Sequence, residues 1–168
     1  MEAKSAFAIT PHDMYEKMLE EYEDFKQDSS SIRHAINFTL TAYHLREWVW
    51  KSYLKSNSKL RSKISKDIKT AHDFYEHMNS ECEELKIVKE LANNVKHFYA
   101  QKGAGSKVER TTGPITWENA DVKWEDLHIE WGYGGLVIIT KDKKGISVLN
   151  VFKSVRNLWE KYFNEFFT

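Results

Sequence analysis

The segment from Lys89 to Phe98, which reads KELANNVKHF, carries residue types that are suited to acid–base chemistry. Its polar side chains are Glu90, Asn93, Asn94 and His97, and intervals of three, four and seven residues place them on one side of a helix. A histidine transfers protons near neutral pH when a neighbouring group orients it. We therefore consider His97 a candidate acid or base with Asn94 beside it. The same pattern equally fits the solvated face of an amphipathic helix.

A second polar stripe interrupts an otherwise apolar predicted helix, and its members are Arg33, Asn37, Thr41, His44 and Trp48. Polar groups among apolar side chains need hydrogen-bond partners, so one interpretation is a structural network inside a helical bundle. The other is that the stripe faces Asn94 and His97 across a cleft. Asn37 and Asn94 then orient a substrate, and the two histidines, His44 and His97, move a proton. Arg33 or Lys96 holds a phosphate group of that substrate.

A cationic segment follows the polar stripe. Its basic residues are Lys51, Lys55, Lys59, Arg61, Lys63, Lys66 and Lys69, set against the single acid Asp67. The first predicted helix has the opposite bias, with acids at Glu16, Glu20, Glu21, Glu23, Asp24 and Asp28. Lys59, Arg61 and Lys63 are candidates for binding nucleic acid or phosphate, because a basic strip neutralises phosphates. The strip can equally pair with the acidic helix of the same chain or of a second copy in a homodimer, and a charge run of this kind is also typical of a solvated face.

Other chemistries find less support in the sequence. His72 and Glu76 have the i, i+4 spacing of metal ligands, but no Cys or third His completes a coordination sphere, so we predict no metal and no cofactor. Cys82 is the only cysteine, which excludes an internal disulfide, and we expect an inert, partly buried thiol. The glycines of WGYGG are typical of a hairpin turn and do not precede a helix as a phosphate loop does.

Length and composition indicate one domain spanning residues 1–168. The chain is 41% hydrophobic and 14% aromatic, with 25 basic and 25 acidic residues and a net charge of zero. No overall field attracts nucleic acid or anionic lipid, so such a partner would need a local patch. Neither a leader segment nor an apolar run long enough to cross a bilayer is evident, so we expect a cytoplasmic protein without a membrane partner.

Apolar periodicity then predicts the elements that must position these residues. Thr10 as N-cap and Pro11 at the first helical position start a helix that ends near Gln27. A two-sided apolar helix, the expected centre of a bundle, follows the serines, and amphipathic stripes predict two more. The predicted ranges are about 32–54, 65–79 and 82–100, and together these helices form a core of about 11–100.

After residue 100 the pattern changes to β-branched and aromatic residues. Strands are predicted at 127–131, 136–141 and 146–149, and Asp142-Lys143-Lys144-Gly145 joins the last two as a hairpin. This β insertion covers about 106–149, and a closing helix with regular three-four spacing covers about 150–166. The predicted fold is α+β and mainly α: a bundle of four to five helices with a small antiparallel hairpin or sheet before the last helix.

Two segments, HAINFTLTAYHLREWVW at His34–Trp50 and ELANNVKHF at Glu90–Phe98, resemble a family of uncharacterised bacterial helical proteins of similar length. More distantly, a helical bundle with a polar residue ahead of a histidine is similar to HEPN domains, which include toxin and defence ribonucleases. That similarity implies metal-independent RNA cleavage by an Arg and a His near the start of a late helix. Here Asn93 or Asn94 stands in the place of that Arg, ahead of His97.

Taken together, these patterns predict a cytoplasmic helical module that binds a protein partner or nucleic acid. The alternative is a HEPN-like, metal-independent ribonuclease or toxin-type defence protein, with His97 and His44 in proton transfer and RNA as partner.

Overall fold

The computed structural model describes residues 9–96, 107–113, 134–142 and 144–167. Within these residues the chain forms six α-helices, one π-helix and a three-stranded antiparallel sheet. The elements in order are α1 (Pro11–Gln27), α2 (Ile32–Val49), η1 (Trp50–Leu54), α3 (Ser58–Ile64), α4 (Ala71–Glu81), α5 (Glu84–Lys96), β1 (Val108–Thr112), β2 (Val137–Thr140), β3 (Gly145–Ser147) and α6 (Val148–Phe166). The fold is therefore α+β and mainly helical, as predicted from the sequence.

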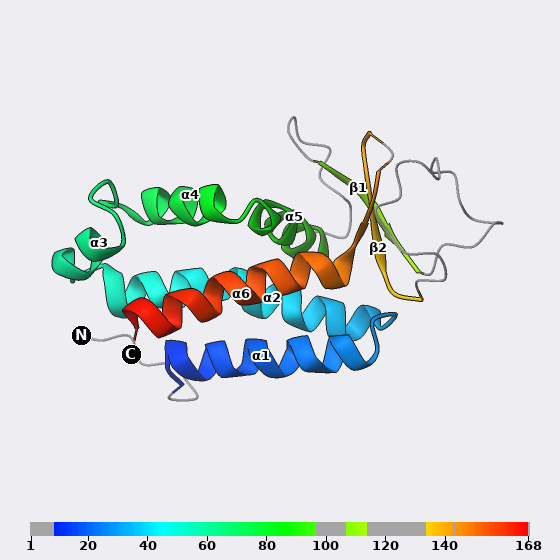
Figure 1. Ribbon diagram of the computed structural model, residues 1–168, viewed down its shortest axis with the longest axis horizontal. Helices are drawn as coiled ribbons and strands as arrows, with labels where there is room; N and C mark the ends of the chain where they lie inside the picture. Colours follow the sequence, from blue (N-terminus) through cyan, green and yellow to red (C-terminus); the bar gives the residue numbers. More distant parts are fainter. Residues whose placement is uncertain (1–8, 97–106, 114–133, 143, 168) are drawn as a thin grey trace.

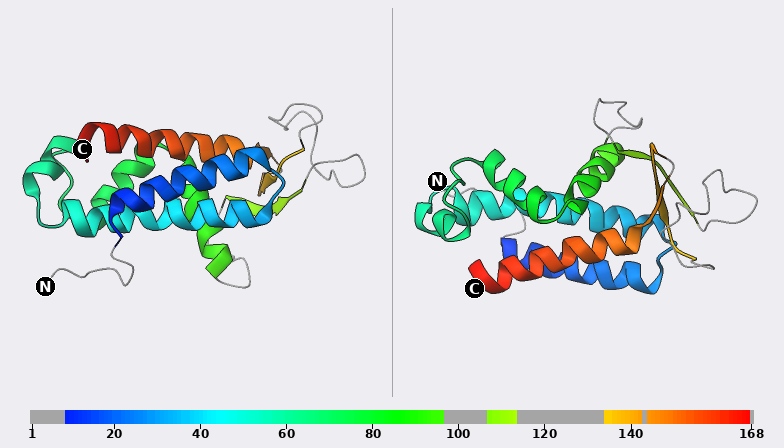
Figure 2. Two further views of the ribbon diagram at one scale, coloured as in Figure 1. Left: turned by 90° about the horizontal axis from the view of Figure 1, so that it is seen from below. Right: turned by 45° about the horizontal axis from the view of Figure 1, so that its top comes forward.

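The helices form an elongated bundle whose two ends differ in construction (Figure 1). α1 and α2 run antiparallel with α6 beside them, and α1 and α5 lie on opposite sides of α2 (Figure 2). We call the end that carries the three strands the sheet end. The opposite end, which carries η1, α3, the start of α1 and the end of α6, is the α3 end. None of the described helices combines the length and apolar character that crossing a bilayer requires.

Helix α6 contributes a long row of buried side chains to the hydrophobic core. The ring of Phe152 stacks on Phe38 of α2 at 4.2 Å between centroids and lies 4.9 Å from Phe25 of α1. Farther along α6, Trp159 and Tyr162 are fully buried. Aromatic rings bury large apolar areas, so these contacts contribute much of the stability of the bundle. The regular apolar spacing predicted for the closing helix is confirmed by this packing.

The two apolar sides predicted for the second helix differ in burial. The first side consists of Phe38, Ala42, Leu45 and Val49, and the second consists of Ile32, Ile36, Leu40, Tyr43, Trp50 and Leu54. All four residues of the first side are buried. The second side begins with Ile32, whose side chain is 66% exposed because it lies in the first turn of α2, at the rim of the bundle. Trp50 and Leu54 at the far end of this side do pack into the core. The buried residues of α2 therefore begin at Phe38, and its C-terminal half still exposes His44 and Glu47.

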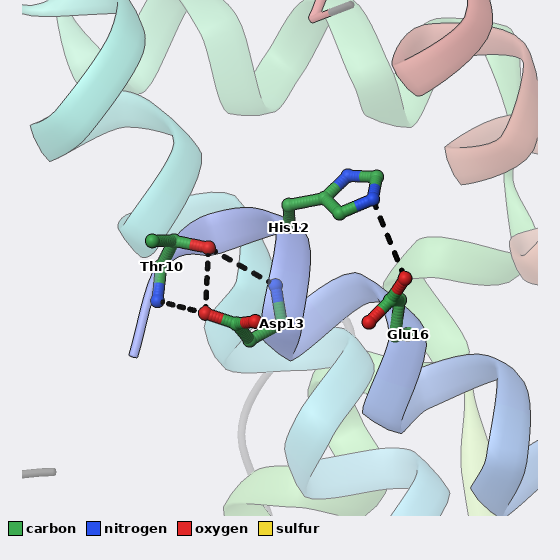
Figure 3. Close-up of polar contacts among 4 residues, drawn as sticks. All are labelled: Thr10, His12, Asp13 and Glu16. Carbon is green, nitrogen blue, oxygen red and sulfur yellow. Dashed lines mark hydrogen bonds and ion pairs between the residues drawn. The ribbon is translucent and has the colours of Figure 1, made fainter. Parts of the chain in front are cut away.

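The first helix begins as predicted. Thr10 is its N-cap: the Thr10 hydroxyl accepts the N–H of Asp13 at 3.2 Å, while the Asp13 carboxylate accepts the Thr10 N–H at 2.6 Å (Figure 3). This reciprocal capping box satisfies backbone donors that the first turn of a helix leaves free. Figure 3 also shows His12 beside Glu16, with 3.5 Å between Nε2 and Oε1.

Several predicted boundaries are corrected by the structure. The helix predicted for 65–79 corresponds to α4, which starts six residues later, at Ala71, because Thr70 and Asp73 form a second capping box, and the short α3 before it was not predicted. The helix predicted for 32–54 has the correct extent but ends in the π-helix η1. The helix predicted for 82–100 begins at Glu84, and residues 97–100 lie outside the described residues. The closing helix starts two residues earlier than predicted, at Val148, after the N-cap Ser147.

The sheet has the order β1-β2-β3, with both pairs antiparallel. The predicted hairpin between the last two strands is confirmed, since Val137 pairs with Ser147 and Ile139 with Gly145. Strand β1 was not predicted, and the strand predicted at 127–131 lies outside the described residues. The carboxylate of Glu90 on α5 accepts the N–H groups of Lys107 and Val108 at 3.0 and 2.9 Å, which ties the start of β1 to α5.

Candidate nucleic-acid interface

Helix α3 presents cations at one end of the bundle, and its apolar residues Leu60 and Ile64 are only partly buried against the core. Asn57 caps the helix by accepting the N–H of Leu60 at 3.0 Å, and no residue of α3 is buried. Lys59 and Lys63 are exposed on this helix. A short helix without buried side chains does not form alone, so other contacts must hold it in place.

Arg61 supplies one of these contacts. Its guanidinium Nη1 donates to the carbonyl oxygens of Leu54 and Lys55 at 2.6 and 2.9 Å. Both carbonyls lie at the C-terminal end of η1. In this π-helix the N–H of Lys55 donates to the carbonyl of Trp50, five residues earlier, at 2.8 Å. The last carbonyls of a helix lack partners within it. Arg61 satisfies that of Lys55 and adds a second donor to that of Leu54, which also accepts the N–H of Asn57 at 3.1 Å. Arg61, predicted as a phosphate ligand, therefore has a structural role in this end of the bundle.

Lys63 links α3 to the end of the chain. Its Nζ donates to the carbonyl of Glu165 at 3.2 Å and lies 5.7 Å from the centre of the Phe166 ring. The neighbouring Phe167 ring lies 5.3 Å from that of Tyr53. These three aromatic side chains are half-buried, so part of each ring remains accessible beside the lysines. The tertiary structure thus places aromatic rings within a segment where the sequence offers Tyr53 alone.

Two groups of this surface have altered acidity. Burial raises the pKa of Tyr53, helped by the charge of Asp13, so its phenol stays neutral at physiological pH. The pKa of Lys51 is raised because its ammonium is hydrogen-bonded to Glu47 at 2.6 Å. Lys51 is therefore already paired, and the cations that remain for a ligand lie farther along the chain.

The exposed lysines of this region are not neutralised by the acidic first helix. The ion pairs of α1 are local: Glu16 with His12, Glu21 with Lys17 and Glu23 with Lys26. Among the described residues, no ion pair joins an acid of α1 to a cation of segment 51–69. Lys55, Lys59 and Lys66 are exposed and form no ion pair with any described residue. Pairing with the acidic first helix of the same chain, one of the explanations left open by the sequence, is thus not found among the described residues.

The residues predicted for proton transfer are only partly covered by the structure. His97 and the side chain of Lys96 lie outside the described residues. Asn94 on α5 and Asn37 on α2 are half-buried, whereas His44 is exposed. Thr41, between Asn37 and His44 on the stripe, is buried and accepts a hydrogen bond from Lys17 of α1 at 2.9 Å. The middle of the stripe therefore borders α1, and α5 lies on the other side of α2 (Figure 1).

Arg33, the other predicted phosphate ligand on this stripe, is exposed in the first turn of α2. Its Nη2 lies 3.4 Å from Nε2 of the neighbouring His34. It sits at the sheet end, whereas Lys59, Arg61 and Lys63 form part of the α3 end (Figure 1). The predicted phosphate ligands thus divide between two separate surfaces.

A pocket of about 300 Å³ lies where α5, the sheet and the start of α6 meet. Its polar lining comprises Glu83, Glu84, Lys107, Thr140, Asn150 and Ser154. None of these residues was singled out from the sequence, because they come from four segments that only the fold brings together. Next to the pocket, Cys82 is buried, and burial raises the pKa of its thiol to about 12, which disfavours the reactive thiolate.

No protein-family model, curated protein or solved structure matches this chain at a significant level. The interpretation of the site therefore depends on the geometry described above.

Proposed function

We propose that this protein is a binding module for single-stranded nucleic acid, and that the α3 end is its binding surface. The observation that carries the proposal is the contact of Lys63 with Phe166 and of Tyr53 with Phe167. Proteins that bind single strands combine a basic surface, which follows the backbone, with aromatic rings on which bases stack. This combination supports nucleic acid over a protein partner.

The placement of charge supports the same proposal. Lys55, Lys59 and Lys66 are exposed cations without an ion pair to any described residue, and their region of the chain contains one acid, Asp67. Because the net charge of the chain is zero, binding would depend on this local patch. Neutralising phosphates releases counterions, so affinity is expected to fall steeply as salt increases.

The first test reverses charge at Lys59 and Lys66, which leaves the structural bonds of Arg61 and Lys63 intact. Fluorescence anisotropy with a labelled single-stranded RNA should show affinity lower by about tenfold. The slope of log affinity against log salt should fall by about 0.7 for each phosphate that the protein no longer neutralises. The matched control carries Lys89→Glu and Lys153→Glu, which are exposed lysines of α5 and α6 away from α3. It changes the net charge equally and should bind like the wild type.

Equally weakened binding in both variants would assign binding to net charge alone and contradict the proposed surface. Absence of binding by the folded wild type at low salt would also contradict it.

The second test separates stacking from charge. Phe166→Leu keeps an apolar side chain but removes the ring, and base–aromatic stacking contributes about 1–3 kcal/mol per base. We expect weaker binding of single strands with an unchanged salt slope. A duplex of the same sequence should bind less tightly to the wild type and should not respond to Phe166→Leu. An equal response of both substrates would argue against stacking.

The alternative ribonuclease activity is tested with the same protein. Labelled RNA incubated with the wild type and a chelator should remain intact if the protein only binds. Cleavage that disappears in His97→Ala, with the folded state preserved, would replace the binding proposal by the enzymatic one.

A further inference from the structure

Two carboxylates of α1 face an imidazole of α2 at the sheet end of the bundle. Glu21 and Asp24 are one helical turn apart, and His34 lies in the first turn of α2. One carboxylate oxygen from each acid and one ring nitrogen of His34 all lie within 4.8 Å of one another. The Glu21 side chain is 13% exposed, His34 is half-buried and Asp24 is exposed, so the cluster opens to solvent on one side.

The turn between α1 and α2 holds these groups in place. Ser31 caps α2 by accepting the backbone N–H of His34 at 3.3 Å. The carbonyl of Ser29 accepts the N–H of Leu136 at 2.7 Å, which fastens the turn to the segment before β2. The three side chains therefore extend from backbone that is fixed on both sides of the turn. Such support by rigid elements is what a binding constellation requires.

The imidazole of His34 is poorly satisfied where it lies. Its Nδ1 atom is fully buried and has no hydrogen-bond partner among the described residues. Its Nε2 has a long contact of 3.4 Å with the exposed Arg33. Buried polar atoms are normally hydrogen-bonded, and an orphan atom calls for an explanation such as a bound ion. Because a guanidinium has only N–H donors, the weak contact with Arg33 is given up when a metal binds, and the imidazole then coordinates through one nitrogen and carries its proton on the other.

One oxygen of the Glu21 carboxylate has no hydrogen-bond partner among the described residues. Lys17 donates to Oε1 of Glu21 at 2.7 Å and to the Thr41 hydroxyl at 2.9 Å, which orients the carboxylate and leaves Oε2 available. Lys17 also competes, because its positive charge opposes a cation at the same carboxylate. Removal of that charge should therefore strengthen binding of a cation.

We propose that Glu21, Asp24 and His34 bind a divalent transition-metal ion of the Zn²⁺ class. One imidazole and two carboxylates suit such ions better than Ca²⁺ or Mg²⁺, which take oxygen ligands alone. Two ligands of one Zn²⁺, each about 2.0–2.2 Å from the metal, are at most about 4.4 Å apart. A small rotation of the exposed Asp24 side chain brings the three ligand atoms within this distance of one another. Water completes the coordination on the solvent side, and the ion joins α1 to α2.

The test is titration of the full chain with ZnCl₂ by calorimetry, followed by titration with CoCl₂ by visible absorption. We expect one Zn²⁺ per chain and Co²⁺ bands typical of a mixed nitrogen and oxygen site. His34→Gln and Asp24→Asn should each weaken binding by at least about tenfold, the lower limit for changes around a metal site. Lys17→Met should strengthen it. Zn²⁺ should raise the melting temperature of the wild type and not that of His34→Gln.

Matched controls lie on the same two helices. Glu23→Gln removes a carboxylate that is paired with Lys26, and His44→Gln removes an exposed imidazole of α2. His12→Gln removes the other His–carboxylate pair, with Glu16. All three should bind Zn²⁺ like the wild type. Binding that survives His34→Gln, that is abolished equally in His12→Gln, or that is absent from the folded wild type would overturn the proposal.

Discussion

The sheet end and the α3 end of this bundle are attached by different kinds of contact. At the sheet end all four residues of β2 are buried, and Phe152 stacks on Phe38 beside it. At the α3 end no residue of α3 is buried, and charged side chains of Arg61 and Lys63 bond to backbone carbonyls instead. Apolar burial fixes the strands at the sheet end, whereas α3 combines the partial burial of Leu60 and Ile64 with these polar bonds and leaves its lysines exposed to a charged ligand.

At both ends, however, a charged side chain forms hydrogen bonds to two backbone groups. Glu90 accepts two backbone N–H groups at the start of β1, and Arg61 donates to two backbone carbonyls at the end of η1. Each is a charged side chain that satisfies groups left free at the end of a secondary-structure element. Glu90 and Arg61, which the sequence places among candidate functional residues, therefore stabilise the fold at the two ends.

The largest expected effect is at the sheet end. Phe152→Ala should lower the free energy of unfolding by about 3–5 kcal/mol, because it opens a cavity between α2, α1 and α6. Leu60→Ala, in α3, should cost about 1 kcal/mol or less. Urea unfolding of both variants measures the difference. Equal costs would show that α3 is held by burial after all.

The second expected effect concerns Cys82, which lies between α4 and α5, midway between the two ends. Because burial raises its pKa to about 12, its thiolate fraction at pH 8 is on the order of 1,000-fold below that of a free thiol. Native protein should therefore react with a disulfide reagent far more slowly than protein unfolded in urea. Rapid reaction of the native thiol would indicate that α4 and α5 separate readily.

A third pair of variants compares the stabilising roles of Glu90 and Arg61. Glu90→Ala and Arg61→Ala should each destabilise the protein by about 1.5–3 kcal/mol, the range for hydrogen bonds to charged groups. Hydrogen exchange should locate the first effect in β1 and the second in η1 and α3. Glu90→Ala should leave the affinity for single-stranded RNA unchanged, and weaker RNA binding by this variant would contradict the separation of the two ends.

The smallest expected effect is a pH dependence at the start of α1. Hydrogen bonds from Thr10 hold the pKa of Asp13 below its usual 3.8. Because the folded state binds this proton less readily than the unfolded state, the stabilisation is present above pH 3.8 and is lost as pH falls through the lower, folded-state pKa. The difference in stability between the wild type and Asp13→Asn should shrink from about pH 5 to about pH 2. A difference that grows toward acid would contradict the capping box.

Local signals account for the parts of the fold that were predicted correctly. Thr10 and Pro11 define the start of α1, and the three-four spacing of Val155, Leu158 and Trp159 identifies α6, because both signals act within one or two turns. The late start of α4 within the helix predicted at 65–79 has a local cause that was overlooked, the capping box of Thr70 with Asp73. The π-helix was not predictable from spacing, since it differs from an α-helix by a single hydrogen-bond step.

The candidate sites likewise combine features that are visible in the sequence with features that arise only on folding. The cationic segment is evident from the sequence, because its charges are neighbours along the chain. The aromatic rings of Phe166 and Phe167 join that segment only through folding, and so do the ligands Glu21, Asp24 and His34 across the turn from α1 to α2. The sequence by itself determined helix caps, apolar faces and the balance of charge, which depend on residues within a few turns. Only the tertiary structure decided which charged side chains bond to the backbone and which remain exposed, because that depends on how the chain brings each side chain close to backbone groups of other elements.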